Sequence, residues 1–197
     1  MFDFDGVIDN NYDLNFELCS KKFLDITVEE HKKQYDGNVH VEREKLKDRD
    51  TGFDFLKCLS DSRKDRKIEE ETKSTLVNLA RNFKLGVISS CHEYGINNYL
   101  KNNGIDNLFY FVYGLETHKL KTYKFKKIFE DFDFKKDECI FITDTLGDIL
   151  EANEVGIGTI AVDFGYHEKE RLKKGNPLKI ISKFKELIEV IKNKNNE

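Results

Sequence analysis

Eight side chains that can bind a cation or a phosphate group stand in four pairs along the chain. The first pair is Asp3 and Asp5, within the opening run Met1-Phe-Asp-Phe-Asp-Gly6. Residues two apart in an extended strand point the same way, so these carboxylates would crowd one spot. Such crowding is costly unless a cation or a shared proton relieves it. A calcium loop does not fit, because the sixth and twelfth positions counted from Asp3 are Ile8 and Leu14 instead of glycine and glutamate.

The last pair, Asp144 and Asp148, lies four residues apart at the predicted start of a helix, which places both side chains on one helical face. A single acid at a helix N-terminus is explained by capping or by the helix dipole. Two acids that face another acidic pair across neighbouring strands would instead form a site for a hard divalent cation such as Mg²⁺.

Hydroxyl and ammonium groups stand between the two acidic pairs. Ser89 and Ser90 follow an apolar run, and Lys119 and Lys121 lie in a loop before a predicted helix. Mg²⁺ together with a serine hydroxyl and a lysine is the equipment needed to hold a phosphoryl group. The order and placement of the four pairs therefore predict phosphoryl chemistry.

The elements that would position these residues alternate regularly from about residue 84. Short apolar runs predict strands, and stretches with helical spacing predict helices between them. Phe2–Asp5 is expected to be one strand, the other strands are expected at 84–89, 108–113, 138–143 and 158–163, and the helices at 68–82, 94–103, 123–132, 147–155 and 183–192. This pattern indicates an α/β fold with a parallel sheet covered by helices on both faces, which binds ligands at the carboxyl ends of its strands.

Residues 12–66 do not show this alternation. They are rich in Lys, Asp and Glu, and 15–24 has the spacing of an amphipathic helix. We interpret 12–66 as a mainly helical insertion between the first and second core strands, with 1–11 and 67–197 as the core. Two histidines of the insertion, His31 and His40, are expected at its surface.

Composition narrows the class of protein. The 197-residue chain carries 33 basic and 37 acidic side chains, and its net charge of −4 argues against a nucleic-acid-binding protein. No apolar run approaches the ~20 residues of a membrane span, and the acidic start lacks the features of a signal peptide. Four scattered cysteines without a CxxC pair favour reduced thiols. We therefore expect a cytoplasmic monomer or homodimer that acts on a small phosphorylated metabolite, with neither nucleic acid nor membrane as a partner.

The motifs together resemble the haloacid dehalogenase superfamily of phosphotransferases. Its D-x-D-G-V/T motif matches Asp3-Phe-Asp-Gly-Val7, its strand-end serine motif matches Val87-Ile-Ser-Ser90, and its D-x-x-x-D motif matches Asp144-Thr-Leu-Gly-Asp148. The resemblance implies a Rossmann-like core, with 12–66 as the helical C1 cap found in members such as phosphoglycolate phosphatases and β-phosphoglucomutases.

The lysine motif of many capped members, K-P-x-P, is the weakest match. The corresponding stretch, His118-Lys-Leu-Lys-Thr122, contains no proline. The motif pattern favours Lys119 as the lysine that neutralises the transferring phosphoryl group, whereas the spacing to the following helix favours Lys121. We place Lys121 slightly ahead and keep both as candidates.

The resemblance also implies a role for each remaining residue. Asp3 would attack phosphorus and form an aspartyl-phosphate, while Asp5 would protonate the leaving group and then activate water. Ser89 would bind the phosphoryl oxygens. Asp3, the backbone carbonyl of Asp5 and Asp144 would bind Mg²⁺, with Asp148 nearby. The dehalogenases of the superfamily lack the second aspartate, so Asp5 favours phosphoryl transfer over cleavage of a carbon–halogen bond.

Two further expectations concern the start of the chain. Mg²⁺ should keep Asp3 ionised, and the crowding of charge should raise the proton affinity of Asp5. Only Met1 and Phe2 precede Asp3, whereas a buried parallel strand usually contains several apolar residues. We therefore expect either that the natural start lies upstream or that the central strand is weakened.

Two other functions remain open. A phosphomutase of the β-phosphoglucomutase type would retain a bisphosphate instead of releasing inorganic phosphate. A signalling receiver domain also combines an acidic pair, a phosphorylated aspartate, Ser/Thr and Lys on a parallel sheet. In that fold, however, the acceptor follows a later strand, and an insertion after the first strand has no place.

Overall fold

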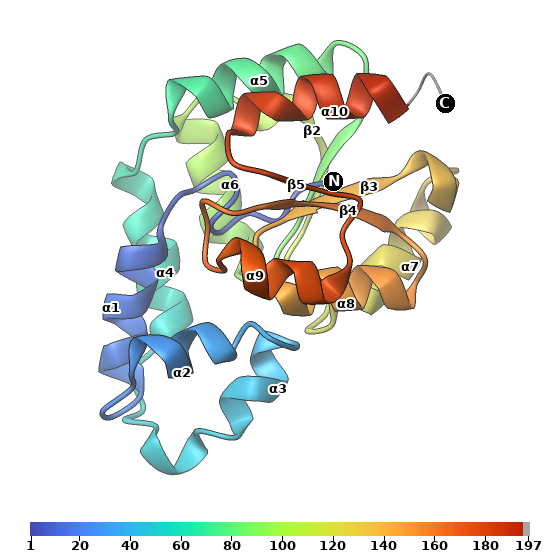
Figure 1. The fold of residues 1–197 in the computed structure, drawn as a ribbon. Coiled ribbons are helices and arrows are strands. Elements are labelled where there is room, and N and C mark those ends of the chain that lie inside the picture. Colours follow the sequence, from blue (N-terminus) through green and yellow to red (C-terminus); the bar gives the residue numbers. More distant parts are fainter. Residues whose placement is uncertain (195–197) are drawn as a thin grey trace.

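The centre of the computed structural model is a parallel sheet (Figure 1). The structure describes residues 1–194, with side chains up to residue 192. Two groups of strands are paired in the orders β2-β1 and β3-β4-β5. Their bounds are β1 (Leu85–Ile88), β2 (Phe109–Tyr113), β3 (Ile140–Thr143), β4 (Gly158–Val162) and β5 (Lys179–Ile181). All of these pairs are parallel, as expected for an α/β fold.

The first three residues join the two groups of strands. Phe2 forms parallel bridges to both β1 and β3. Its amide donates to the Gly86 carbonyl at 2.8 Å, and its own carbonyl accepts from the Ile88 amide at 2.9 Å. On the other side, the Asp3 amide donates to the Ile142 carbonyl at 2.8 Å. The N-terminal segment therefore lies in the middle of the sheet and places Asp3 at the carboxyl edge.

The predicted strand ends two residues early, because the chain turns immediately after Asp3. The Phe4 carbonyl accepts from the amides of Ile8 and Asp9 at 2.9 and 3.0 Å. Gly6 has a φ of +76°, and a Cβ there would lie 2.0 Å from Asp144 Oδ2, so only glycine fits this turn. The turn corrects the expectation that both acids of the first motif extend from one strand.

Helices cover both faces of the sheet (Figure 1). Neighbouring strand residues point to opposite faces, so Ile142 packs in one core and Phe141 in the other. The first face is covered by α5 (Glu70–Ala80), α6 (Glu93–Asn102) and α10 (Leu187–Lys194), and the second by α7 (Lys121–Asp131), α8 (Leu146–Glu154) and α9 (Lys169–Leu172). Short 3₁₀ turns η3 (Asp106–Leu108), η4 (Lys136–Glu138), η5 (Lys173–Gly175) and η6 (Phe184–Glu186) connect these elements.

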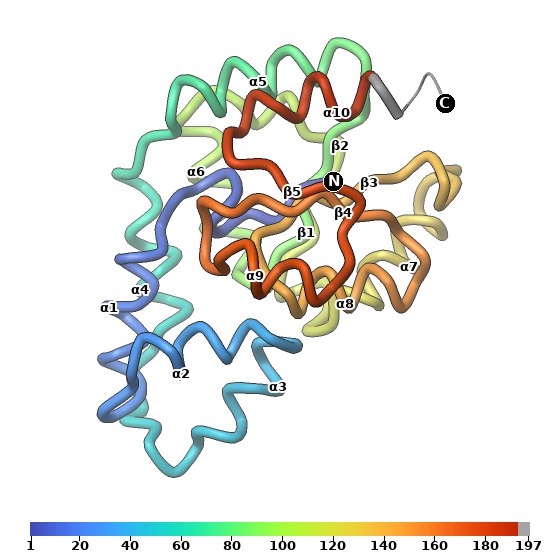
Figure 2. Tube along the Cα trace, viewed as in Figure 1, coloured from blue at the N-terminus to red at the C-terminus, as the bar shows by residue number. Residues whose placement is uncertain are grey.

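The segment between the first turn and α5 is helical, as predicted. It contains α1 (Tyr12–Lys22), α2 (Val28–Lys33), α3 (Val39–Glu44), η1 (Lys47–Arg49), α4 (Phe55–Ser62) and η2 (Arg63–Asp65). Figure 2 shows this part of the chain leaving the sheet and returning to it as a separate group. We refer to residues 12–66 as the cap; its status as a separate domain stays a prediction. Within residues 1–194, no helix is long and apolar enough to cross a bilayer.

Ion pairs join the cap to the core. Lys32 Nζ of α2 lies 3.0 Å from Glu168 Oε2, immediately before α9. Arg171 in α9 pairs with Glu29 at the start of α2. One ion pair has its base on the side of α2, and the other has its acid there. The charges of the two helices therefore complement one another where α2 lies against α9.

A backbone contact brings the cap and the core still closer. The Gly147 amide at the start of α8 donates to the Tyr35 carbonyl of the cap at 2.8 Å. A Cβ at Gly147 would lie only 2.1 Å from the Gly37 carbonyl oxygen. This approach requires glycine at position 147, and the cap in this structure is closed on the core.

His31 is buried in the cap, so its expected surface position is wrong. Its Nε2 lies 3.0 Å from Asn15 Oδ1. The ring packs among aromatic rings at centroid distances of 5.3 to 6.0 Å, those of Tyr12, Phe16, Tyr35 and Tyr166. Burial, reinforced by the charge of Arg43, lowers the pKa of His31 to about 3. His31 is therefore neutral in the folded protein over the whole physiological range.

Replacement of His31 should reduce the loss of folding stability at acidic pH. The unfolded chain takes up a proton at His31 below the ordinary histidine pKa of 6.5, whereas the folded chain does not until about pH 3. The contribution of His31 to the free energy of unfolding is therefore fully present above pH 6.5. It falls by about 1.4 kcal/mol per pH unit as the pH decreases towards 3, because the unfolded chain binds one more proton than the folded chain. Urea unfolding of the wild type and His31→Gln between pH 4 and 7 should show slopes that differ by this amount. Parallel curves would contradict the assignment.

Candidate functional site

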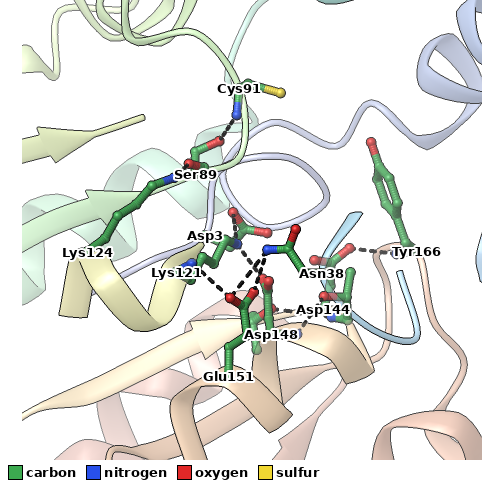
Figure 3. A network of polar contacts seen from close by, with 12 residues as sticks. Asp3, Asn38, Ser89, Cys91, Lys121, Lys124, Asp144, Asp148, Glu151 and Tyr166 are labelled. Atoms are coloured by element: carbon green, nitrogen blue, oxygen red, sulfur yellow. Dashed lines mark hydrogen bonds and ion pairs between the residues drawn. The ribbon is translucent and has the colours of Figure 1, made fainter. Parts of the chain in front are cut away.

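Asp3, Ser89, Lys121, Asp144 and Asp148 lie close together at the carboxyl edge of the sheet (Figure 3). A cavity of about 40 Å³ lies there, lined from the core by Asp3, Asp5, Ser90, Lys121 and Asp148. The cap closes it with Asn15, Tyr35, Arg43 and Phe55. A larger and mainly apolar cavity of about 410 Å³, at the opposite edge near Met1 and Phe134, contains none of the predicted site residues.

Lys121 is the lysine that reaches the first acidic pair. It begins α7, is buried, and its Nζ lies 2.8 Å from Asp3 Oδ1 and 2.5 Å from Asp148 Oδ2. Although burial alone would lower the pKa of Lys121, these two carboxylates raise it. Lys119 is exposed, and its backbone carbonyl accepts from Asn38 Nδ2 at 3.2 Å. Of the two candidate lysines, the structure brings only Lys121 to the cavity.

Burial controls the charge of the core carboxylates. It raises the pKa of Asp3 well above its usual range, an effect that Lys121 opposes and that Asp148 and Asp144 reinforce. Burial also raises the pKa of Asp144 to about 8, although the Tyr166 amide donates to its Oδ2 at 2.7 Å. Without a further positive charge, these carboxylates hold protons more strongly than free aspartates do.

The two acids of the last motif are not needed to cap α8. Thr145 is the N-cap and accepts from the amide of Asp148 at 3.4 Å. Asp148 Oδ2 also accepts from the hydroxyl of Thr143 at 2.8 Å. The structure therefore uses Asp148 to fix Lys121, and leaves Asp144 for another partner.

Asp144 offers the strongest sign of a cation site. Its Oδ1 is buried and accepts no hydrogen bond in the described structure, a costly arrangement unless a cation compensates it. Asp3, Asp144 and the Asp5 carbonyl would be an oxygen donor set suited to Mg²⁺. Among the described residues no group of three Asp, Glu, His or Cys side chains is placed to hold a metal ion by itself, so such a set depends on the backbone carbonyl and on water.

Asp5 is held by two donors from outside the sheet. Its Oδ1 accepts from Asn11 Nδ2 at 2.5 Å and from Nη2 of the buried Arg63. Burial alone would raise the pKa of Asp5, but Arg63, with Cys91 and Asn11, holds it below its usual range. The expected order of proton affinities is therefore reversed in the chain without a cation: Asp3 is the more basic carboxylate, because Arg63 neutralises Asp5.

The two serines occupy different positions. Ser89 is fully buried, and its hydroxyl accepts from the Cys91 amide at 3.1 Å, whereas Ser90 lines the cavity. Lys124, one turn after Lys121, donates to the Ser89 carbonyl, and burial lowers its pKa to about 8. The bond from this second lysine to the Ser89 carbonyl thus holds the loop that follows β1.

Several residues of the site were not among the sequence candidates. Glu151 accepts from the Lys121 amide at 2.9 Å, and Tyr166 donates its hydroxyl to Asn11 Oδ1 at 2.9 Å. Arg43 projects from α3 to the cavity, where its Nη2 lies 3.0 Å from the Tyr35 hydroxyl. Tyr166 lies in the run Phe164-Gly-Tyr-His167 after β4, and all three side chains lie outside the motifs found in the sequence.

One curated protein is similar to part of the chain. It is a phosphoglycolate phosphatase of Photorhabdus laumondii subsp. laumondii, 30% identical over 125 residues. The aligned stretch covers 61% of this chain and 53% of that protein, so this chain matches about half of the relative's length.

Solved structures share the fold over nearly the whole chain. A hydrolase from Pseudomonas syringae superposes with a TM-score of 0.80 at 14% identity, covering 98% of this chain and 96% of that one. A haloacid dehalogenase-like family hydrolase from Streptococcus pneumoniae gives 0.71 at 19% identity, with 96% of each chain covered. The family model described as haloacid dehalogenase-like hydrolase matches residues 1–162. Since this match takes in most of the chain, the protein belongs to the haloacid dehalogenase-like hydrolase family.

Proposed function

We propose that this protein is a Mg²⁺-dependent phosphatase that hydrolyses a small phosphomonoester through an aspartyl-phosphate on Asp3. The observation that carries the proposal is the position of Lys121, whose ammonium group lies 2.8 Å from Asp3 Oδ1 inside a small cavity closed by the cap. An ammonium beside a carboxylate can bind the phosphoryl oxygens that arrive for attack. The similarity to a phosphoglycolate phosphatase supports the same chemistry.

The proposed reaction has two steps. A carboxylate oxygen of Asp3 attacks phosphorus, and the bond from phosphorus to the leaving oxygen breaks. The Asp5 carboxyl, which must be protonated when substrate is bound although Arg63 favours its ionised form, gives its proton to that oxygen. Water then attacks the phosphoryl group, Asp5 takes the proton from water, and the bond between phosphorus and Asp3 breaks. Asp5 thereby regains the proton that it gave, and Asp3 regains its carboxylate.

Mg²⁺ bound by Asp3, Asp144 and the Asp5 carbonyl would supply positive charge for the phosphoryl oxygens and keep the Asp3 carboxylate ionised. The chain's own groups do the remaining work. Lys121 neutralises the charge between Asp3 and Asp148, Ser90 offers a hydroxyl at the cavity wall, and the closed cap excludes water.

Asp3 and Asp5 should respond differently to the same substitution. Asp3→Asn should abolish both turnover and covalent labelling by p-nitrophenyl phosphate. Asp5→Asn should still form the adduct, because p-nitrophenolate leaves without a proton, and the adduct should persist because no base remains to activate water. Intact-mass measurement after mixing distinguishes the two variants. A phosphorylated Asp3→Asn protein would show that the nucleophile is misassigned.

The two candidate lysines provide a matched pair of variants. Lys121→Met should lower kcat/KM by about 10²–10³, because it removes a preorganised charge beside the transferring group. Lys119→Met should change kcat/KM by about threefold or less, since the side chain is exposed and outside the cavity. Steady-state kinetics at saturating Mg²⁺, with circular dichroism to check folding, tests the pair. Equal losses in both variants would contradict the assignment of Lys121.

A phosphomutase of the β-phosphoglucomutase type is the second candidate. It is favoured by Arg43, a cation that the cap presents to the same cavity and that could hold the second phosphate of a bisphosphate. A panel containing 2-phosphoglycolate and glucose 1-phosphate separates the two functions, because a phosphatase releases inorganic phosphate and a mutase yields an isomerised sugar phosphate. Because the chain belongs to a hydrolase family, the signalling receiver domain is disfavoured as an interpretation.

Substrate should enter only when the cap opens. A cavity of about 40 Å³ has room for only a few water molecules, each of which needs roughly 10–15 Å³ of such space, so the closed form has no room for a phosphomonoester. Opening about segments near 9–11 and near the start of α5, followed by closure, would admit the substrate and then exclude water.

Gly147→Ala should separate cap closure from folding. The added Cβ would meet the Gly37 carbonyl oxygen, whereas alanine within α8 is intrinsically better than glycine by up to about 1 kcal/mol. We expect a similar melting temperature, faster proteolytic cleavage within residues 23–54, and activity lowered at least about tenfold. Glu154→Ala, at an exposed position of the same helix, is the control. Unchanged cleavage and activity in Gly147→Ala would exclude this contact from closure.

A further inference from the structure

The two segments that connect the cap to the core both reach Asp5. The first connection contributes Asn11, the N-cap residue of α1, and the second contributes Arg63 of η2. Asn11 Nδ2 and Arg63 Nη2 donate to the same oxygen, Oδ1 of Asp5. Neither of them donates to Oδ2, and Asp5 lines the reaction cavity. Both connections thus hold the Asp5 carboxyl group through the same oxygen atom.

Arg63 has an unusual environment for a cation. Its side chain is 0% exposed, and its guanidinium carbon lies 4.8 Å from the centre of the Phe4 ring. Nε and Nη1 are buried and have no hydrogen-bond partner in the described structure. Burying a charge with unsatisfied donors is destabilising, and apolar residues of similar volume often replace such pairs without loss. Stability alone therefore gives no reason for an arginine here.

A second arginine shows what a purely structural tie between the same connections looks like. Arg66 Nε donates to both carboxylate oxygens of Asp9, at 2.7 and 3.0 Å, and Arg66 Nη2 donates to the Asn10 carbonyl at 2.8 Å. These bonds join the two connections, yet they do not touch Asp5. Arg66 is therefore a matched control for Arg63.

We infer that Arg63 is a positioning residue: it holds Oδ1 of Asp5 so that Oδ2 faces the leaving group, and it does so only while η2 occupies the closed position of the cap. The inference rests on the proposed function. η2 directly follows α4 of the cap but also packs against α6 of the core, so the guanidinium would leave Asp5 if opening of the cap separates η2 from α6. Proton transfer by Asp5 would then be possible only after closure over a substrate.

The consequence depends on the leaving group. Departure of an alkoxide requires a proton from Asp5, whereas departure of p-nitrophenolate does not. Loss of Arg63 should therefore penalise an alkyl phosphate much more than p-nitrophenyl phosphate in kcat/KM, which reports the first step. Hydrolysis of the aspartyl-phosphate also uses Asp5, so with p-nitrophenyl phosphate the second step should become rate-limiting. A rapid release of p-nitrophenolate equal to the amount of enzyme should then precede steady turnover.

The test compares the wild type with Arg63→Lys, Arg63→Gln and the control Arg66→Lys, using ethyl phosphate and p-nitrophenyl phosphate with saturating Mg²⁺. Circular dichroism measures the folded fraction of each protein. We expect the ratio of kcat/KM for ethyl phosphate to that for p-nitrophenyl phosphate to fall at least about tenfold in the Arg63 variants, with a burst of p-nitrophenolate. In Arg66→Lys the ratio should stay within about twofold of the wild type, because Arg66 does not contact Asp5.

Three results would overturn the inference. Equal losses with both esters in the Arg63 variants would indicate fewer folded molecules and no effect on Asp5. A fall of the ratio in Arg66→Lys as large as in Arg63→Lys would assign the effect to the connections in general. Failure of both Arg63 variants to fold while Arg66→Lys folds would make Arg63 a folding residue only. If the wild type hydrolyses neither ester, the proposed function fails, and the inference falls with it.

Discussion

The site depends on one buried ammonium group, which balances the negative charge of two carboxylates. Lys121 lies between Asp3 and Asp148, which come from the first segment of the chain and from α8. Without it, two carboxylates would share a cavity from which water is largely excluded, and the resulting repulsion would favour their protonation or their separation. The contact requires that the start of α7, the edge of the central segment and the first turn of α8 meet at one point. The parallel sheet and the helices on its second face provide that meeting point.

Much of this arrangement could be predicted from the sequence, because it follows from topology. The alternation of apolar runs with helical stretches predicts the sheet, and the carboxyl ends of parallel strands lie along one edge. Asp3, Ser89 and Asp144 each follow such a run, so their convergence needs no knowledge of side-chain contacts. The end of the first strand was misjudged because apolar Phe4 continues the pattern. Its carbonyl instead accepts from the Ile8 amide, at 2.9 Å, and closes a turn.

The sequence could not reveal contacts between segments that are distant in the chain and lack a periodic pattern. Arg63 lies 58 residues from Asp5, in a stretch of alternating charges that looks like a solvated surface. The pairing nevertheless reverses the expected order of proton affinities in the first motif. His31 was likewise assigned to the surface because one histidine among charged residues gives no sign of burial. Its environment is built from rings of three separate segments, two in the cap and one in the core, and only the folded cap packed on the core brings them together.

The contact between Tyr35 and Gly147 has a thermodynamic consequence for the core. The first amides of a helix have no partner within the helix itself. In α8 the Leu146 amide donates to His167 Nδ1 at 3.0 Å, and the Gly147 amide donates to the Tyr35 carbonyl at 2.8 Å. The cap therefore serves as an N-terminal capping group for the helix that carries Asp148. If the cap lifts as proposed, that amide would lose its protein partner and be solvated, so the first turn of α8 would fray more readily. Hydrogen exchange at Gly147 would then report the position of the cap, and order in the charged site would be greatest with the cavity shut.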